Sequence, residues 1–437
     1  MSDLTRRTVL ESAAGLVAPR WKAATPRQGG TSQTGGAPDD ESFWADVRRR
    51  FELDPAQHNL VTVVRGVTTK AIREQVAATT ARYNWFRAGG EPAAAVRTRV
   101  RAKAAAFVGA SPEHIALLRN TTEGVTTVLA NWPLDRGDEI LTSSAEHGPF
   151  YDTLFARAAR DGVQLRRFHY PAPAPSAAAI VAAIEQALTP RTRLVLIGQV
   201  VLTGQITPVR AIADLVHAHG ARLLVDGVLA VGHVPVDIGA MDCDFFAAGF
   251  HKWGCGPRAT AVFYVKPELV ARLPPLFGAY TEGERGAYRA LWNAATMTKF
   301  ESFGAHPEPH LFALGDAVDF LDEVGASRIQ RRLFALTSRW LSRAERVRGF
   351  RAAVRHDPAH CAGLVAWEIA GVPRVRVREA LTRRRLLVGG TEAYGGFFGI
   401  PLDEPRSLFI ANTGVFTSVA DVDQLAEAIE EAGTSGA

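Results

Sequence analysis

The chain has 437 residues, a formal net charge of +5 and three cysteines, and 47% of its residues are hydrophobic. This length allows two or three domains, and the composition excludes a disordered chain, a collagen and a disulfide-held scaffold. No apolar run approaches the ~20 residues that a membrane-spanning helix needs, so we expect no membrane partner. The basic triplets Arg48–Arg50 and Arg383–Arg385 lack interleaved aromatic residues, so we expect no nucleic-acid partner.

Residues 1–40 are predicted to form a disordered N-terminal segment. The run Thr5-Arg6-Arg7-Thr8-Val9-Leu10 has the pattern of a twin-arginine export signal, but Glu11 interrupts the apolar stretch that should follow. We therefore favour a remnant of such a signal in a cytoplasmic protein, with export by the twin-arginine route as the alternative. Residues 25–38 have the composition of a flexible tether, and an acidic helix start follows near Asp39.

From residue 91 onward, helical and extended patterns alternate. Helices are predicted over residues 91–108, 123–132, 149–160, 180–188 and 208–219. Strands are predicted over residues 115–118, 138–141, 163–168, 194–197, 222–226, 245–248 and 261–265. Strands that are apolar throughout and alternate with helices indicate an α/β fold with a mostly parallel sheet covered on both faces. We assign this large domain to residues 41–305.

The pattern changes after Pro307. One long helical region is predicted to run to about Val347, and extended segments at 364–369 and 386–388 surround a helix that begins near Val372. A last strand at residues 408–410 precedes a helix over residues 421–432. These elements predict a smaller α+β domain over residues 306–437, against which residues 41–75 are a candidate to pack.

Two ionisable residues follow predicted strands directly. Asp226 ends the apolar run 223–225, and Lys252 follows the strand at 245–248 within Gly249-Phe250-His251-Lys252-Trp253-Gly254. In a parallel sheet, ligands bind at the carboxyl ends of the strands. Burial among apolar groups would lower the pKa of a lysine and make its amine nucleophilic, so we predict an active site built on these two residues. The alternative for Lys252 is an ordinary loop lysine.

Seven motifs occur in the order that is typical of one enzyme family. They are Arg119-Asn120-Thr121-Thr122-Glu123-Gly124, Ser144-Ala145-Glu146-His147, Leu202-Thr203-Gly204-Gln205-Ile206-Thr207-Pro208-Val209, Val225-Asp226-Gly227, His251-Lys252-Trp253 with Gly256-Pro257, Phe300-Glu301-Ser302-Phe303-Gly304, and Arg406 with Asn412-Thr413. The chain resembles the pyridoxal-phosphate (PLP) enzymes of fold type I, in the class V aminotransferase family. It most resembles the isopenicillin-N-epimerase-like branch, well over residues 90–310 and loosely in the C-terminal part.

The resemblance implies PLP as the cofactor and two catalytic residues. Lys252 would form a Schiff base with the cofactor aldehyde and then act as general base. Asp226 would pair with the protonated pyridine nitrogen and so make the ring an electron sink. The resemblance also implies a homodimer with its sites at the subunit interface.

Five further residues would bind cofactor or substrate if the resemblance holds. Thr121, Thr122 and His251 would contact the cofactor phosphate, with Thr121 and Thr122 just before a helix that begins at Glu123. His147 would stack over the pyridine ring, although a solvated loop histidine is the alternative. Arg406 would bind the substrate carboxylate as a bidentate fork.

Three positions depart from the family pattern, and all three have become apolar. Leu229 replaces the His or Gln that the family places near the phenolic oxygen of the cofactor, and Gln199-Val200-Val201-Leu202 lacks a second polar contact to that oxygen. Ala305 replaces a threonine that would reach the phosphate of the partner subunit. Each lost hydrogen bond costs only about 0.5–1.5 kcal/mol, so we expect the cofactor to bind but the reaction to differ from plain transamination.

The predicted function is that of a PLP-dependent enzyme acting at the alpha carbon of an amino acid or amino-acid conjugate, through a Schiff base and a quinonoid. Epimerisation and beta-elimination by a C–S lyase are the leading reactions. Decarboxylation or oxidative deamination, and transamination, are the alternatives. A catalytically degenerate binding protein is a third hypothesis, against which the retention of both Lys252 and Asp226 speaks, since an unpaired buried charge is unfavourable.

Other polar and aromatic residues receive plainer interpretations. Two prolines in His306-Pro307-Glu308-Pro309-His310 preclude the helical spacing that zinc would need, so we expect no metal. Cys243, Cys255 and Cys361 contain no CxxC pair and are read as free thiols. Tyr83-Asn84-Trp85-Phe86 is a candidate lining for the substrate side of the pocket, with core aromatics as the alternative.

Overall fold

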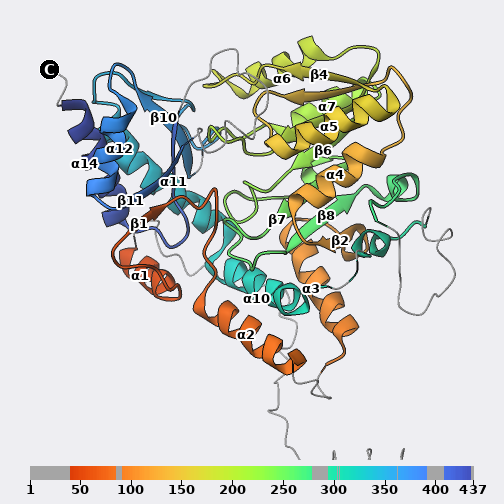
Figure 1. Ribbon diagram of the computed structural model, residues 1–437, viewed down its shortest axis with the longest axis horizontal. Helices are drawn as coiled ribbons and strands as arrows, with labels where there is room; N and C mark the ends of the chain where they lie inside the picture. Colours follow the sequence, from red (N-terminus) through yellow and green to blue (C-terminus); the bar gives the residue numbers. More distant parts are fainter. Residues whose placement is uncertain are drawn as a thin grey trace, which may run out of the picture. The chain divides into compact units, whose positions relative to one another are not determined.

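The computed structural model of the chain contains two β-sheets with flanking helices in its described residues (Figure 1). The structure describes residues 40–84, 91–277, 294–302, 304, 306–361, 363–390 and 408–434. The twin-arginine pattern at Thr5–Leu10 therefore lies outside the described residues. Residues 38–437 form one compact unit, so the domain boundary at 305/306 stays a prediction.

The larger sheet has seven strands in the part of the chain that the structure describes, in the order β2-β8-β7-β6-β5-β3-β4. Their bounds are β2 (Ile115–Leu118), β3 (Glu139–Ser143), β4 (Gln164–Phe168), β5 (Thr192–Gly198), β6 (Arg222–Asp226), β7 (Phe245–Gly249) and β8 (Ala261–Val265). The five neighbours from β4 to β7 run parallel, whereas β8 is antiparallel to both β7 and β2. The prediction of an α/β fold with a mostly parallel sheet is confirmed.

Helices cover both faces of this sheet (Figure 1). They are α3 (Ala93–Phe107), α4 (Thr121–Asn131), α5 (Gly148–Asp161), α6 (Ala177–Ala187), α7 (Val209–Ala218) and α8 (Ile238–Met241), with short 3-10 turns η1 (Pro112–His114), η2 (Pro267–Arg272) and η3 (Met297–Glu301). Successive residues of β5 point to opposite cores: Leu194 and Leu196 pack with α4 and α5, and Val195 and Ile197 pack with α6 and α7. A strand buried on both faces is therefore apolar at every position.

Within the described residues, the smaller sheet has five strands in the order β1-β11-β12-β10-β9. Its strands are β1 (His58–Leu60), β9 (Phe350–Ala352), β10 (Leu364–Ile369), β11 (Leu386–Gly390) and β12 (Phe409–Asn412). The remaining helices are α1 (Glu41–Arg49), α2 (Lys70–Asn84), α10 (Glu308–Val324), α11 (Ala326–Ala344), α12 (Arg374–Arg383) and α14 (Val419–Thr434). In Figure 1, α10 lies beside α2 and α3, and α11 packs against α14.

Three predicted elements differ from the structure. The single helical region after Pro307 is two helices, because Gly325 has φ +91° and ends α10 before α11 begins. Helix α4 begins at Thr121 rather than Glu123, because the Asn120 side chain caps it by accepting a hydrogen bond from the Glu123 N–H. Strand β1 was not predicted; it has three residues and pairs in parallel with β11.

None of the helices in the described ranges is long and apolar enough to cross a membrane.

Asp421 joins α14 to α1 and β1. Its side chain is 3% exposed, Arg48 donates to Oδ2 at 2.7 Å, and His58 Nδ1 lies 2.7 Å from Oδ1.

We expect Asp421→Ala to lower the free energy of unfolding by about 2 kcal/mol, because it leaves Arg48 without its buried partner. Urea denaturation measures this loss. Asp423→Ala is the control, since the pair of Asp423 with Arg339 is half exposed and should contribute under about 1 kcal/mol; equal losses in the two variants would contradict the assignment.

Candidate active site

A cavity of about 280 Å³ lies at the carboxyl ends of β5, β6 and β7. Its polar lining groups come from the loops after these strands, from the turn after β3 and from the start of α4. The lining residues are Val63, Val64, Asn120, Thr121, Thr122, Ala145, Glu146, His147, Phe150, Gly198, Val200, Val201, Leu202, Asp226, Val228, Leu229, His251 and Lys252. Six of the seven site residues predicted from the sequence therefore line this cavity, namely Thr121, Thr122, His147, Asp226, His251 and Lys252.

Asp226 and Lys252 share this cavity. Asp226 is the last residue of β6, and its Oδ1 accepts a hydrogen bond from the Val228 N–H at 2.8 Å. Burial raises the pKa of Asp226 to about 6, although the Val228 N–H and the charge of Lys252 oppose this shift. Burial lowers the pKa of Lys252 to about 8, against the opposing effect of Asp226. A base and an acid thus lie in one desolvated space, with both titrations close to neutral pH.

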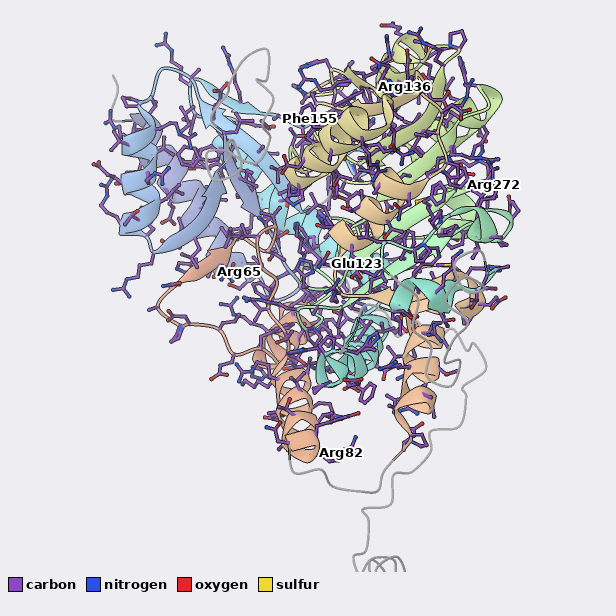
Figure 2. All side chains as sticks on the ribbon, turned by 45° about the vertical axis from the view of Figure 1, so that its right-hand side comes forward. Arg65, Arg82, Glu123, Arg136, Phe155 and Arg272 are labelled. Carbon is purple, nitrogen blue, oxygen red and sulfur yellow. The ribbon has the colours of Figure 1, made fainter. Side chains whose placement is uncertain are left out.

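The loop that carries Lys252 is held by the segment between β1 and α2. The Gly66 N–H donates to the His251 carbonyl at 2.9 Å. A Cβ on Gly66 would lie 1.9 Å from the Lys252 carbonyl oxygen, so only glycine allows the two backbones to approach this closely. Arg65, labelled in Figure 2, precedes this contact. Sequence reasoning missed the segment because nothing local marks it as part of the site.

A second support comes from Trp253, the residue after Lys252. Its indole N–H donates to the Thr413 carbonyl at 2.7 Å, and its ring stacks on His233 with centroids 4.2 Å apart. The Nδ1 of His233 donates to the Leu229 carbonyl, and its Nε2 accepts from the Gly363 N–H, both at 2.7 Å. Burial lowers the pKa of His233 to about 4, so this ring is neutral.

The N-terminus of α4 forms the opposite end of the cavity. Glu123, labelled in Figure 2, lies in the first turn and accepts from the Arg119 N–H, while its own N–H is capped by Asn120. The N–H groups of Thr121 and Thr122 belong to the same turn and have no partner within the helix. The Thr121 hydroxyl accepts from the Gly249 N–H at 2.8 Å. These donors and the helix dipole are suited to holding an anion.

His147 and His251 complete the polar lining. His147 immediately precedes α5, is exposed along the cavity, and meets Phe150 edge to face at 5.5 Å. Desolvation and the nearby charge of Lys252 lower the pKa of His147 and of His251. Both rings are therefore neutral near pH 7, and a neutral imidazole face is suited to stacking.

Two of the three departures from the family pattern fall in the lining of the cavity. Val200, Val201, Leu202 and Leu229 all line the cavity as apolar wall. Val63 and Val64, which sequence reasoning did not nominate, extend this wall.

Several nominated residues lie elsewhere. Arg406, Ala305, and the aromatic residues Trp85 and Phe86 are outside the described residues. Tyr83 is 41% exposed at the end of α2 and does not line the cavity.

The donor set fits the cofactor that the resemblance implies. A helix N-terminus with two N–H groups that have no partner within the helix suits a phosphate, a carboxylate suits a pyridine nitrogen, and a desolvated amine suits an aldehyde. Gly249 completes the cradle, because a Cβ at that position would lie 2.7 Å from the His251 ring and force it to move.

Comparison with known proteins agrees with this geometry. The model of the family "Aminotransferase class-V" matches residues 68–391. Isopenicillin N epimerase of Streptomyces clavuligerus is 26% identical over 404 residues, which are 89% of this chain and 98% of that protein. A cysteine desulfurase of Klebsiella pneumoniae is 31% identical over 283 residues, which are 62% of this chain and 66% of that protein.

Solved structures share the fold. The cysteine desulfurase CsdA of Escherichia coli has a TM-score of 0.76 at 21% identity and covers 90% of this chain and 99% of its own. A C-DES mutant with glycine covalently linked to its PLP cofactor has a TM-score of 0.76 at 19% identity, over 88% of this chain and 99% of its own. Since the family model spans most of the chain, the protein belongs to the class V aminotransferase family and is a PLP-dependent enzyme.

Proposed function

We propose that this enzyme removes the alpha proton of an amino acid or amino-acid conjugate, with Lys252 as the base. The observation that carries the proposal is the presence of Lys252 and Asp226 in one desolvated cavity. PLP, when bound, supplies an aldehyde that captures the substrate amine and a ring that withdraws electrons from the alpha carbon. Side chains of the protein bind the cofactor, orient the substrate and move the proton.

Each nominated residue receives a role in this proposal. The Lys252 amine, with its pKa lowered to about 8, is neutral often enough near pH 7 to accept a proton. The Asp226 carboxylate holds a proton on the pyridine nitrogen. Thr121 and Thr122 bind the phosphate with His251, and His147 stacks over the ring.

Arg406 is proposed to bind the substrate carboxylate, on the strength of the sequence resemblance. The homodimer is proposed on the same ground.

Delivery of a proton to the opposite face of the alpha carbon gives epimerisation, and loss of a beta substituent gives C–S cleavage. The near full-length similarity to an epimerase supports the first outcome. The similarity of the central part to cysteine desulfurases supports the second. The same cavity leaves decarboxylation, oxidative deamination and transamination as alternatives, because the apolar wall at Val201 and Leu229 alters the surroundings of the phenolic oxygen.

The cysteines restrict what kind of C–S cleavage is possible. A desulfurase that passes sulfur to one of its own thiols needs an accessible thiolate. Cys243, Cys255 and Cys361 are the only cysteines of the chain, and all three are buried. Burial raises the pKa of Cys255 and of Cys361 to about 12. We therefore propose that sulfur, if it is cleaved, leaves in a small-molecule product.

Incubation with candidate amino acids in deuterated water separates the outcomes by mass spectrometry. Deuterium at the alpha carbon of otherwise intact substrate favours epimerisation, and pyruvate with a thiol favours elimination. Loss of one carbon indicates decarboxylation, and an oxo-acid that requires a co-substrate indicates transamination. A protein that turns over no amino acid and takes up no PLP would contradict the proposal and favour the degenerate binding protein.

Lys252→Ala is expected to lower the rate of alpha-proton exchange by about 10³-fold, because it removes the base. Proton NMR of the substrate in deuterated water measures the exchange. Lys266→Ala is the matched control, since Lys266 pairs with Asp242 at 2.8 Å outside the cavity and should retain full exchange. Equal exchange by the Lys252→Ala variant and the native enzyme would exclude Lys252 as the base.

Gly66→Ala is expected to lower turnover by about 10²-fold, because its Cβ must push the Lys252 backbone out of place. The same variant should bind PLP more weakly, as measured by the absorbance of the bound cofactor. Gly315→Ala in α10 is the control, since the nearest atom to its Cβ is 3.4 Å away. Native turnover in the Gly66→Ala variant would show that this contact does not position Lys252.

A further inference from the structure

A second acid, Glu146, reaches the cavity from the turn between β3 and α5. It is 2% exposed and lines the cavity together with Asp226. Its Oε1 accepts from the Ser143 hydroxyl at 2.6 Å and from the Gly198 N–H at 3.1 Å. Gly198 is the register partner of Asp226 in the β5–β6 pair. The carboxyl group of Glu146 therefore joins the ends of β3 and β5 beside the strand end that carries Asp226.

The two oxygens of Glu146 have different surroundings. Both donors, from Ser143 and Gly198, end on Oε1, and within the described ranges no hydrogen bond ends on Oε2. A protonated carboxyl has this asymmetry, because its carbonyl oxygen accepts while its hydroxyl oxygen carries a proton to donate. The hydroxyl oxygen would then be Oε2 of a residue that lines the cavity.

The charge of Asp226 acts on Glu146 in the same direction. The carboxylate of Asp226 faces it from β6 and disfavours its ionisation, whereas the phenols of Tyr151 on α5 and Tyr170 after β4 are neutral neighbours whose pKa values are raised chiefly by burial. The cavity cation, Lys252, interacts with Asp226. Burial and the charge of Asp226 raise the pKa of Glu146 to about 8, although the donors on Oε1 oppose the shift. A carboxyl that is buried beside another carboxylate keeps its proton.

We propose that Glu146 is a positioning residue that stays protonated at neutral pH, so that Asp226 is the single carboxylate at its end of the cavity and the Oε2–H of Glu146 is a donor into the site. The inference rests on the proposed function only in giving Asp226 its role toward the pyridine nitrogen. In this arrangement, neutral Glu146 clamps the ends of β3 and β5 without adding a second negative charge beside Asp226.

Infrared difference spectroscopy on the full chain tests the proton directly. The native protein minus the Glu146→Gln variant should show the C=O stretch of a protonated carboxyl at pH 6.5, both with PLP bound and after its removal. In the cofactor-free protein this band should disappear with a midpoint near pH 8. Absence of the band at pH 6.5, or a midpoint near the ordinary pKa of ~4.3 for glutamate, would overturn the proposal.

Two further variants shift the midpoint in opposite directions. Asp226→Asn should move it to lower pH, because the charge that disfavours ionisation is gone, and Ser143→Ala should move it to higher pH, because a donor to the ionised form is lost. A midpoint that moves in neither variant would contradict the geometry. If Glu146→Gln fails to fold, the midpoints are read from the pH difference spectra of the native protein and of these two variants.

The pH dependence of stability gives an independent readout. A group whose pKa is raised in the folded state stabilises the protein fully below its unfolded pKa and loses that contribution as pH rises to the folded value. The urea midpoint of the cofactor-free native protein should therefore fall between pH 5 and pH 8 by more than that of Glu146→Gln. Equal slopes would overturn the proposal. Since no turnover is measured, this failure would leave the proposed function intact.

Discussion

The site depends on the burial of two opposite charges, Lys252 and Asp226, in one cavity. Removing either group from water disfavours its charged form, and each charge partly offsets this effect on the other. Burial remains the larger effect, so the pKa values converge to about 8 and about 6. An amine that is readily neutral and an acid that is readily ionised at the same pH are what a carbonyl cofactor with a basic ring requires.

The fold produces this pair by ending two adjacent strands at the cavity. β6 ends at Asp226, and β7 ends three residues before Lys252. The loop after β7 is then held from outside the larger sheet, by Gly66 on one side and by the Thr413 carbonyl, which binds Trp253, on the other. Segments distant in the sequence therefore hold the loop that carries Lys252, and a change in either contact is expected to act on the proposed chemistry without touching the substrate.

Local patterns explain what could be predicted from the sequence. Strands such as β6 are apolar at every position and end in turn signals, so they are visible without any knowledge of their neighbours. Strand β1 cannot be recognised in this way, because a run of three residues is too short to show a hydrophobic pattern and its partner β11 is distant in the sequence. The apolar pattern after Pro307 continues across Gly325, which hides the break between α10 and α11.

The same distinction holds for the site. Lys252 and Asp226 were predictable because each follows a recognisable strand within a motif. The part played by Gly66 was not, since it depends on a contact with a loop far along the chain. Glu146 lies inside a recognised motif, yet its pKa depends on the Gly198 N–H and on Asp226, neither of which is near it in sequence.

The most direct measurement of the central claim is to locate the covalent attachment of the cofactor. The protein is purified with PLP bound, reduced with borohydride, digested and analysed by tandem mass spectrometry. The account predicts a single pyridoxyl-modified peptide with the modification on Lys252. Modification of another lysine, or a reduced protein with no modified peptide despite bound PLP, would contradict it.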